Sequence, residues 1–79
     1  MPSVDTQFAY TLLLEPDPEG MGFTATVPAL PGIVVQGGTE EETVERAREA
    51  IAFHIQCLRE DGLPIPREQQ PPRLVSVQI

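Results

Sequence analysis

The sequence of 79 residues has no tryptophan, no lysine, one histidine and one cysteine. Because Cys57 has no second cysteine in the chain to pair with, a secreted scaffold held by internal disulfides is not expected. Three phenylalanines and one tyrosine are the aromatic residues, so the core must be mainly aliphatic. No apolar run approaches the roughly 18 residues of a membrane-spanning helix, and the N-terminus lacks the features of a signal peptide. We therefore expect a cytoplasmic protein without a membrane span.

Basic residues are also scarce: twelve acids outnumber five arginines, and the net charge is −7. Binding to nucleic acid through its phosphates needs a basic face, so direct nucleic-acid binding is not expected. An acidic chain favours solubility or a basic protein partner. This length predicts a single domain, residues 1–79, that buries only about 60% of its unfolded surface. Oligomerisation is the obvious way to bury more, and we expect a homo-oligomer.

Four strands are predicted, at 7–14, 22–27, 33–36 and 73–79, the third as a short apolar run that Gly37 and Gly38 end. The first strand is apolar on both sides, which predicts a central position in the sheet. The second alternates apolar residues with threonines, which predicts one apolar face and one threonine-rich face. The last alternates Val75, Val77 and Ile79 with more polar positions.

The stretch 27–42 joins two strands to the start of a helix. Pro28 and Pro31 lack backbone donors and predict a turn, with Leu30 as an apolar tip between them. Thr39 and Glu42 have the spacing of a capping box, which predicts a helix over 40–61. Gly62 is expected to end that helix. The apolar stripe predicted to cover the sheet consists of Val44, Ala47, Ile51, Ile55 and Leu58.

Counting strand directions predicts that the last strand runs parallel to the first. A right-handed crossover that places these two side by side gives the sheet order 3-2-1-4. The predicted fold class is therefore α+β: a β-β-β-α-β two-layer sandwich with a four-stranded mixed sheet and one helix on one face.

Two segments of the sequence carry a resemblance to a known family. The first begins at Gly20 and reads Gly-Met-Gly-Phe-Thr-Ala-Thr-Val-Pro-Ala-Leu-Pro-Gly-Ile-Val-Val-Gln-Gly-Gly-Thr-Glu-Glu-Glu, followed by the predicted helix. The second is Gly62-Leu63-Pro64-Ile65-Pro66, directly after that helix. Together they resemble the HicB-like antitoxin family in residue type and order, the second being similar to its Gly-x-x-Ile-Pro pattern. The resemblance implies a partial ribonuclease H-like fold.

By this resemblance the chain is an antitoxin-like module that binds and neutralises a small basic HicA-type toxin, an RNA-cleaving protein with a double-stranded-RNA-binding-like fold. The opposite net charges would steer such an association. The candidate contact positions are Leu30, Glu41, Glu45 and Phe53. No helix-turn-helix or ribbon-helix-helix segment, which the fuller family pattern includes, follows the last predicted strand, so the question of operator binding and autoregulation stays open.

The helix carries a second apolar feature opposite its predicted core stripe. Phe53 is predicted to point away from the sheet, with Ala50 and Cys57 close to it on the helix surface. This pattern fits either an isolated exposed phenylalanine or a surface for self-association.

Residues that could support catalysis are few. His54 has no nucleophile placed beside it by the sequence, and Cys57 has no second ligand for a metal. Ribonuclease H-like nucleases hold two metal ions with carboxylates that include one on the first strand, but residues 8–14 contain no acid. The expectation is a protein that is not an enzyme and has no metal or cofactor.

Two other functions stay open. One is an orphan HicB-like homo-oligomeric scaffold or small-ligand module without a toxin partner. The other is a residual metal-dependent RNA hydrolase that uses Glu42 or Glu45.

Overall fold

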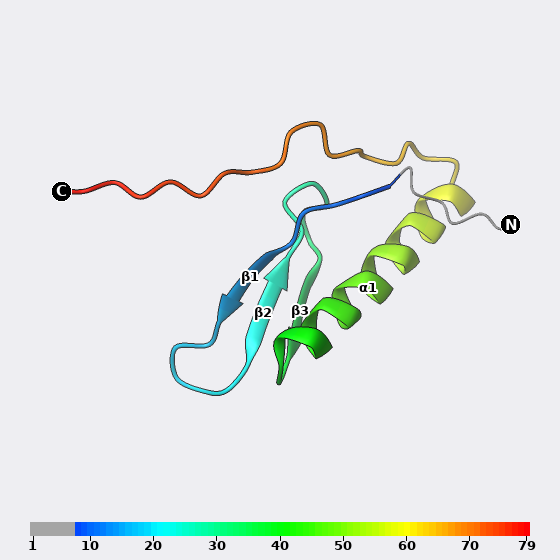
Figure 1. Ribbon diagram of the computed structural model, residues 1–79. Coiled ribbons are helices and arrows are strands. Elements are labelled where there is room, and N and C mark those ends of the chain that lie inside the picture. The colour runs from blue at the N-terminus through cyan, green and yellow to red at the C-terminus, as the bar shows by residue number, and fades with distance from the viewer. Residues whose placement is uncertain (1–7) are drawn as a thin grey trace, which may run out of the picture.

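One antiparallel sheet and one long helix make up the fold in the computed structural model, which describes residues 8–79 (Figure 1). The strands are β1 (Leu13–Pro16), β2 (Phe23–Thr26) and β3 (Val34–Gly37), in the spatial order β1-β2-β3. The helix α1 (Glu40–Glu60) packs against β2 and β3. The predicted α+β class, with an antiparallel three-stranded meander and a helix on one face, is confirmed.

Strand β1 starts later than the sequence predicted. The predicted strand covered 7–14; residue 7 lies outside the described residues, and pairing begins at Leu13, opposite Thr26. Continued toward the N-terminus, that register would set residues 8–12 against 27–31. Pro28 and Pro31 in that stretch have no N–H to donate, and the chain turns there, so the ladder cannot continue.

The predicted fourth strand is not formed within the described residues. The segment 73–79 is extended but pairs with no strand, and it runs away from the sheet (Figure 1). The four-stranded order 3-2-1-4 is therefore wrong for this chain, and the ribonuclease H-like arrangement that depends on it is not supported. Pro71 and Pro72 explain the difference, because two prolines hold the backbone extended and donate no hydrogen bond into a ladder.

The core lies between α1 and the sheet, where five apolar side chains are at most 9% exposed. They are Ala25, Val27, Leu30, Ile33 and Ala47. Val27, Leu30 and Ile33 form a central cluster, against which Tyr10, Leu12, Val35, Ala50 and Ile51 pack.

Leu30 corrects a prediction, since the sequence analysis named it a candidate contact position at the tip of a turn, whereas the residue is 1% exposed. The turn is tight because the Leu30 N–H donates to the Val27 carbonyl at 2.9 Å and the Ile33 N–H donates to the Leu30 carbonyl at 3.3 Å. Gly32 has φ of 103°, a left-handed conformation that favours glycine. This geometry folds the Leu30 side chain back into the core.

Helix α1 turns its small residues to the sheet and its larger apolar residues to one side. Thr43 and Ala47 are both 0% exposed, and Ala50 packs against the central cluster. Val44 and Ile51 are half-buried along the flank nearer to β1. The predicted stripe is confirmed at Ala47, which is buried, and at Ile51, which packs against the central cluster, but the placement of Ala50 on the outward face is wrong. Small side chains at the contact let the helix approach the sheet closely, which is why these positions are buried.

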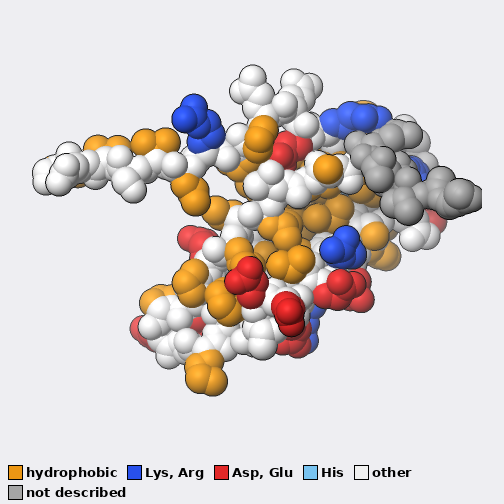
Figure 2. Space-filling view, viewed as in Figure 1, with side chains coloured by type: hydrophobic (Ala, Val, Ile, Leu, Met, Phe, Trp, Pro, Cys, Tyr) orange, Lys and Arg blue, Asp and Glu red, His pale blue; other side chains and the backbone are white. Residues whose placement is uncertain are grey.

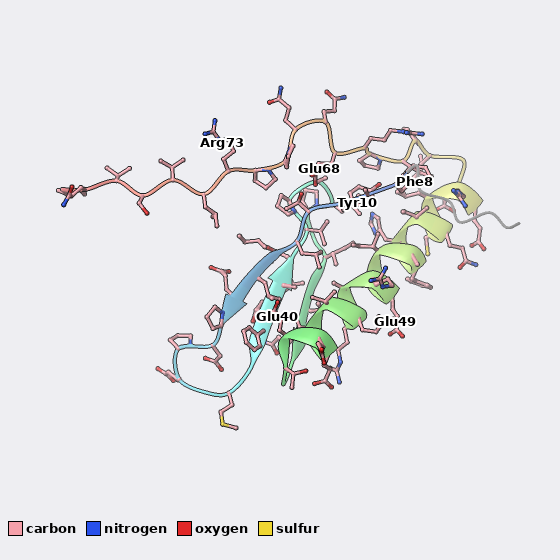
Figure 3. The ribbon with its side chains drawn as sticks, in the orientation of Figure 1. Phe8, Tyr10, Glu40, Glu49, Glu68 and Arg73 are labelled. Atoms are coloured by element: carbon pink, nitrogen blue, oxygen red, sulfur yellow. The ribbon has the colours of Figure 1, made fainter. Side chains whose placement is uncertain are left out.

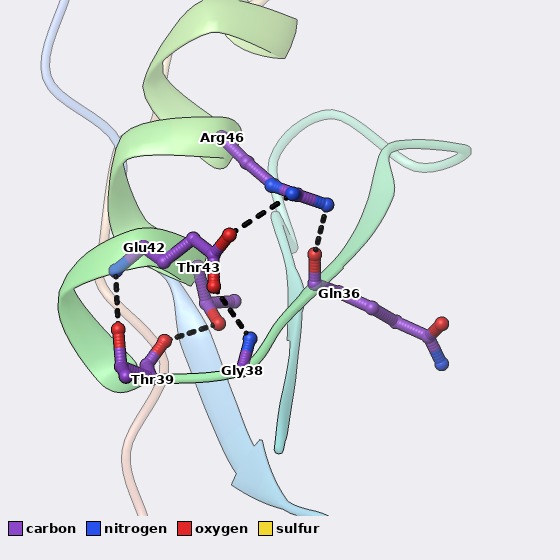
Figure 4. Close-up of polar contacts among 6 residues, drawn as sticks. All are labelled: Gln36, Gly38, Thr39, Glu42, Thr43 and Arg46. Carbon is purple, nitrogen blue, oxygen red and sulfur yellow. Dashed lines mark hydrogen bonds and ion pairs between the residues drawn. The ribbon is translucent and has the colours of Figure 1, made fainter.

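The predicted capping box at the start of α1 is confirmed (Figure 4). The Thr39 hydroxyl accepts from the Glu42 N–H at 3.0 Å, while the Glu42 carboxylate accepts from the Gly38 N–H at 2.8 Å. Arg46 donates to the same carboxylate at 3.0 Å and to the Gln36 carbonyl at 3.1 Å, which ties the first turn of the helix to β3. The Gly38 N–H first, and the Arg46 charge second, lower the pKa of Glu42.

Gly62 ends α1 as predicted. It has φ of 69°, its N–H donates to the Arg59 carbonyl at 3.1 Å, and the Leu63 N–H donates to the Leu58 carbonyl at 2.9 Å. This pair of bonds is the Schellman motif. Among residues 8–79, no helix combines the length and the apolar character that crossing a membrane requires.

Candidate partner-binding surface

Four side chains spaced four residues apart form a ridge on α1. Glu41, Glu45, Glu49 and Phe53 all lie on the exposed face of the helix. Residues four apart in a helix are neighbours on one side, and this series extends about 18 Å along the axis. The Phe53 side chain is 68% exposed, which is unusual for a residue of its size. We call this series the acid–aromatic ridge.

Acidic side chains gather over the end of the molecule where α1 begins (Figure 2). Figure 3 shows Glu49 on the side of α1 away from the sheet. The first turn also carries Glu40, Glu41 and Glu42, which interact favourably with the positive end of the helix dipole. Local helix stability therefore explains part of the acidic cluster, whereas Glu45, Glu49 and Phe53 lie beyond the first turn.

The side chains of the ridge interact only weakly with the rest of the helix. The Glu45 carboxylate accepts a 3.3 Å contact from Arg48, and both side chains are more than 60% exposed. Exposed ion pairs of this kind contribute about 0 to 1 kcal/mol. The Arg48 contact is therefore weak enough for a cation on another protein to replace it.

The remaining residues singled out in the sequence do not join the ridge. Leu30 is in the core, and Ala50 packs against the central cluster. Cys57 is a free, half-buried thiol, and His54 is also half-buried, on the side of α1 that faces the sheet. The predicted self-association patch therefore keeps Phe53 as its one exposed member, because Ala50 and Cys57 are half-buried and Ala50 packs against the central cluster.

A set of long-range contacts, which sequence reasoning missed, joins the segment before β1 to the segment after α1. Thr11 donates to the Glu68 carboxylate twice, from its N–H at 2.7 Å and from its hydroxyl at 2.6 Å. The Tyr10 hydroxyl donates to the Pro66 carbonyl at 2.5 Å. Figure 3 shows Tyr10 and Glu68 close together where the two segments meet. We call these contacts the clasp.

Phe8 extends the clasp to the end of α1. The Arg67 guanidinium lies 4.9 Å from the centre of the Phe8 ring, and that of Arg59 lies 5.5 Å from it. Both distances fit cation–π attraction. Burial raises the pKa of Tyr10, and the Arg67 charge opposes that rise. No periodic signal in the sequence predicts such contacts, because they join residues more than 50 positions apart.

The clasp predicts a decrease in stability at acid pH. The hydrogen bonds from Thr11, side chain first and then backbone, lower the pKa of Glu68 below its ordinary value of 4.5. Glu42 shifts in the same direction. Because the pKa of Glu68 is lower in the folded state, the ionised carboxylate contributes to the free energy of unfolding. This contribution is fully present above about pH 4.5 and is lost as the pH falls through the pKa of the folded state.

We expect the urea midpoint of the wild type to fall as the pH is lowered below about 4.5, and Glu68→Gln to show a smaller fall. Glu19→Gln, in the exposed β1–β2 turn, is the matched control and should follow the wild type. Equal acid sensitivity of Glu68→Gln and the wild type would show that the clasp carboxylate does not couple to folding.

No group of three or more histidine, cysteine or acidic side chains within residues 8–79 is arranged to hold a metal ion. Glu42, a candidate for the residual hydrolase, is engaged with Gly38, Thr39 and Arg46 at the helix start.

The described residues thus form a small α+β domain with a charged, partly apolar helix face. Residues 10–76 match the family described as the HicB_like antitoxin of bacterial toxin-antitoxin system. This match covers most of the chain, and the chain belongs to that family. The resemblance noted in the sequence is confirmed.

Relatives support the same assignment. The chain is 37% identical over 59 residues to a UPF0150 protein of Thermoplasma acidophilum, covering 75% of this chain and 84% of the relative. It is 39% identical over 61 residues to a UPF0150 protein of Synechocystis, covering 77% and 76%. A 14.9 kDa uncharacterised protein of Haemophilus phage HP1 is 39% identical over 46 residues, 58% of this chain and 35% of the phage protein. No solved structure matches the chain significantly.

Proposed function

We propose that this protein is an antitoxin that binds and neutralises a small basic HicA-type toxin in the cytoplasm, without catalysis of its own. Membership of the antitoxin family is the observation that carries the proposal, because a toxin partner is implied by that family in general. The acid–aromatic ridge is the surface to which we assign the contact.

The charge of the chain supports this partner. A protein of net charge −7 attracts a basic protein over distances of about 8 Å to 10 Å at ordinary salt, which raises the association rate. Glu41, Glu45 and Glu49 concentrate that charge on one helix face, where they would pair with toxin lysines or arginines. An RNA-cleaving toxin needs a basic surface for its substrate, so an acidic ridge that covers this surface would exclude RNA.

Phe53 gives the ridge an apolar anchor. Binding energy at protein interfaces is concentrated in a few residues, and aromatic side chains in a desolvated setting are prominent among them. Phe53 lies four residues beyond Glu49 and is 68% exposed, so it can enter an apolar pocket of a partner while the glutamates lie at the rim. Leu30 has no part in this contact, because its side chain is buried.

The proposal predicts that Glu41→Gln with Glu45→Gln weakens toxin binding about tenfold or more, about 1.4 kcal/mol, as measured by calorimetry with a HicA-type toxin from the same genome. The matched control is Glu15→Gln with Glu19→Gln, which removes the same two charges from the β1–β2 region. The control should bind within about twofold of the wild type. Phe53→Ala should weaken binding by at least about 1 kcal/mol.

Three results would count against the proposal, each in a different way. Equal losses in both double variants would show that net charge and not the ridge attracts the toxin. Unchanged binding in the ridge variants would move the contact to another surface. If the wild-type protein neither binds the toxin nor stops its RNA cleavage at low salt, the antitoxin assignment itself fails.

A further inference from the structure

The last seven residues form an exposed, strand-like tail. Residues 73–79 alternate Val75, Val77 and Ile79 with Leu74, Ser76 and Gln78. The four apolar side chains are highly exposed: Leu74 90%, Val75 73%, Val77 76% and Ile79 116%. Figure 2 shows apolar side chains along this tail where it projects from the body. An extended apolar segment whose backbone N–H and C=O groups are unpaired can form a strand at the exposed edge of a sheet.

Strand β1 offers such an edge, because it is one of the two outer strands of the sheet. The Asp17 N–H donates to the Gly22 carbonyl at 2.8 Å, so Asp17 and Gly22 are a hydrogen-bonded pair in the β1–β2 register. Hydrogen-bonded and non-hydrogen-bonded pairs alternate along an antiparallel ladder. Leu13 and Glu15 therefore hydrogen-bond to their partners on β2, whereas the N–H and C=O of Leu14 point outward, away from β2. The free edge therefore presents a donor and an acceptor to an incoming strand.

An apolar hollow lies beside the same edge. Phe8, Ala9, Tyr10, Leu12, Val44, Arg48 and Ile51 line a space of about 410 Å³ between the segment before β1 and α1. Because α1 packs against β2 and β3, the core is open on the β1 side. A strand paired with β1 would place every second side chain on the helix side of the sheet, toward this hollow.

The tail does not turn toward β1 of its own chain. The clasp fixes Glu68 to Thr11, and residues 67–72 pass beside Pro28 and Ala29. Pro71 and Pro72 then keep the chain extended and direct the tail away from the body (Figure 1). Within residues 8–79, therefore, the strand-like tail pairs with no strand and no segment covers the outer edge of β1.

We propose that the tail of one chain pairs with β1 of a second copy, and that the exchange is reciprocal in a two-fold dimer. Val75, Val77 and Ile79 fill the hollow of the partner, and Ser76 and Gln78 face the other side. A reciprocal exchange closes, because each tail is used by the β1 edge of the other copy, so it does not propagate into fibres through these two elements. The acid–aromatic ridge lies on the outward face of α1 and stays open, so the dimer presents two ridges.

The test measures the mass of the full chain in solution by light scattering, together with amide exchange at Leu14. The wild type should have about twice the mass of the 8.7 kDa chain, and the Leu14 amide should be protected. Val75→Lys with Val77→Lys should halve the mass and speed Leu14 exchange at least tenfold. Ser76→Lys with Gln78→Lys is the matched control: it adds the same charge to the other face of the tail and should remain a dimer.

Each alternative overturns the proposal in a distinct way. A monomeric wild type with protected tail amides means that the tail closes onto its own sheet, and a monomeric wild type with fast-exchanging tail amides means that the tail is not paired. A dimer that survives Val75→Lys with Val77→Lys uses another surface, such as Phe53. A dimer that dissociates in this variant while Leu14 exchange stays the same is held by tail-to-tail contact. Toxin binding is measured separately, by calorimetry, so the failure of the dimer and the failure of the antitoxin assignment remain distinguishable.

Discussion

Leu30→Ala is expected to lower the free energy of unfolding by about 2 to 5 kcal/mol. Leu30 is 1% exposed and belongs to the central cluster with Val27 and Ile33, so its removal leaves a cavity that the tight turn cannot collapse. The net stability of a domain is typically only about 5 to 15 kcal/mol, and a chain of this size lies near the lower end. A large part of the variant should be unfolded at 37 °C.

Urea unfolding followed by circular dichroism would measure this loss, at one fixed protein concentration because a dimer makes stability depend on concentration. Met21→Ala is the control, since Met21 is 89% exposed and a surface change of this kind stays within about 0.5 kcal/mol. A Leu30→Ala protein as stable as Met21→Ala would mean that the turn opens and that Leu30 lies at the surface.

Local signals in the sequence predicted the parts of the fold that depend on neighbouring residues. Thr39 and Glu42 predicted the helix start, Gly62 predicted its end, and both are confirmed by hydrogen bonds between residues at most five apart. The alternation in the predicted second strand indicated one apolar face, and Ala25 and Val27 on that face are buried. These features are set by backbone donors, φ angles and periodicity, all of which can be assessed within a short window of sequence.

The predictions that failed depended on contacts between distant segments. An apolar Leu30 between two prolines fits an exposed tip as well as a buried residue, and the choice depends on what α1 places above the turn. Likewise, Ala50 is too small for periodicity to show which side of the helix it takes. The alternation at 73–79 predicted a fourth strand that is not formed within the described residues, because alternation alone does not show which strand a segment pairs with.

The candidate site also has a part that local sequence signals predict and a part that they do not. Helical spacing places Glu41, Glu45 and Phe53 on one exposed face, and the structure adds Glu49 between them. By contrast, no pattern in the sequence predicts that Glu68 accepts two hydrogen bonds from Thr11. The ridge follows from the helix alone, whereas the clasp depends on how the chain returns after the helix.

Gly37→Ala is the second change expected to have a large effect. A Cβ at Gly37 would lie 2.5 Å from the Thr43 hydroxyl, 2.9 Å from the Thr43 N and 3.0 Å from its Cα. Two of these atoms belong to the helix backbone, and Thr43 is fully buried, so α1 must move away from β3 to make room. Crowding of this kind typically lowers the free energy of unfolding by about 1 to 3 kcal/mol.

Gly38→Ala is a close control, because it removes the next glycine from the same connection. Its Cβ would meet only the end of the Glu42 side chain, at 3.3 Å. Both changes restrict the unfolded chain equally, so that contribution cancels in the comparison. Urea midpoints should therefore place Gly37→Ala well below Gly38→Ala. Equal midpoints would contradict the close contact between β3 and α1, and with it the fixed position from which the helix presents its ridge.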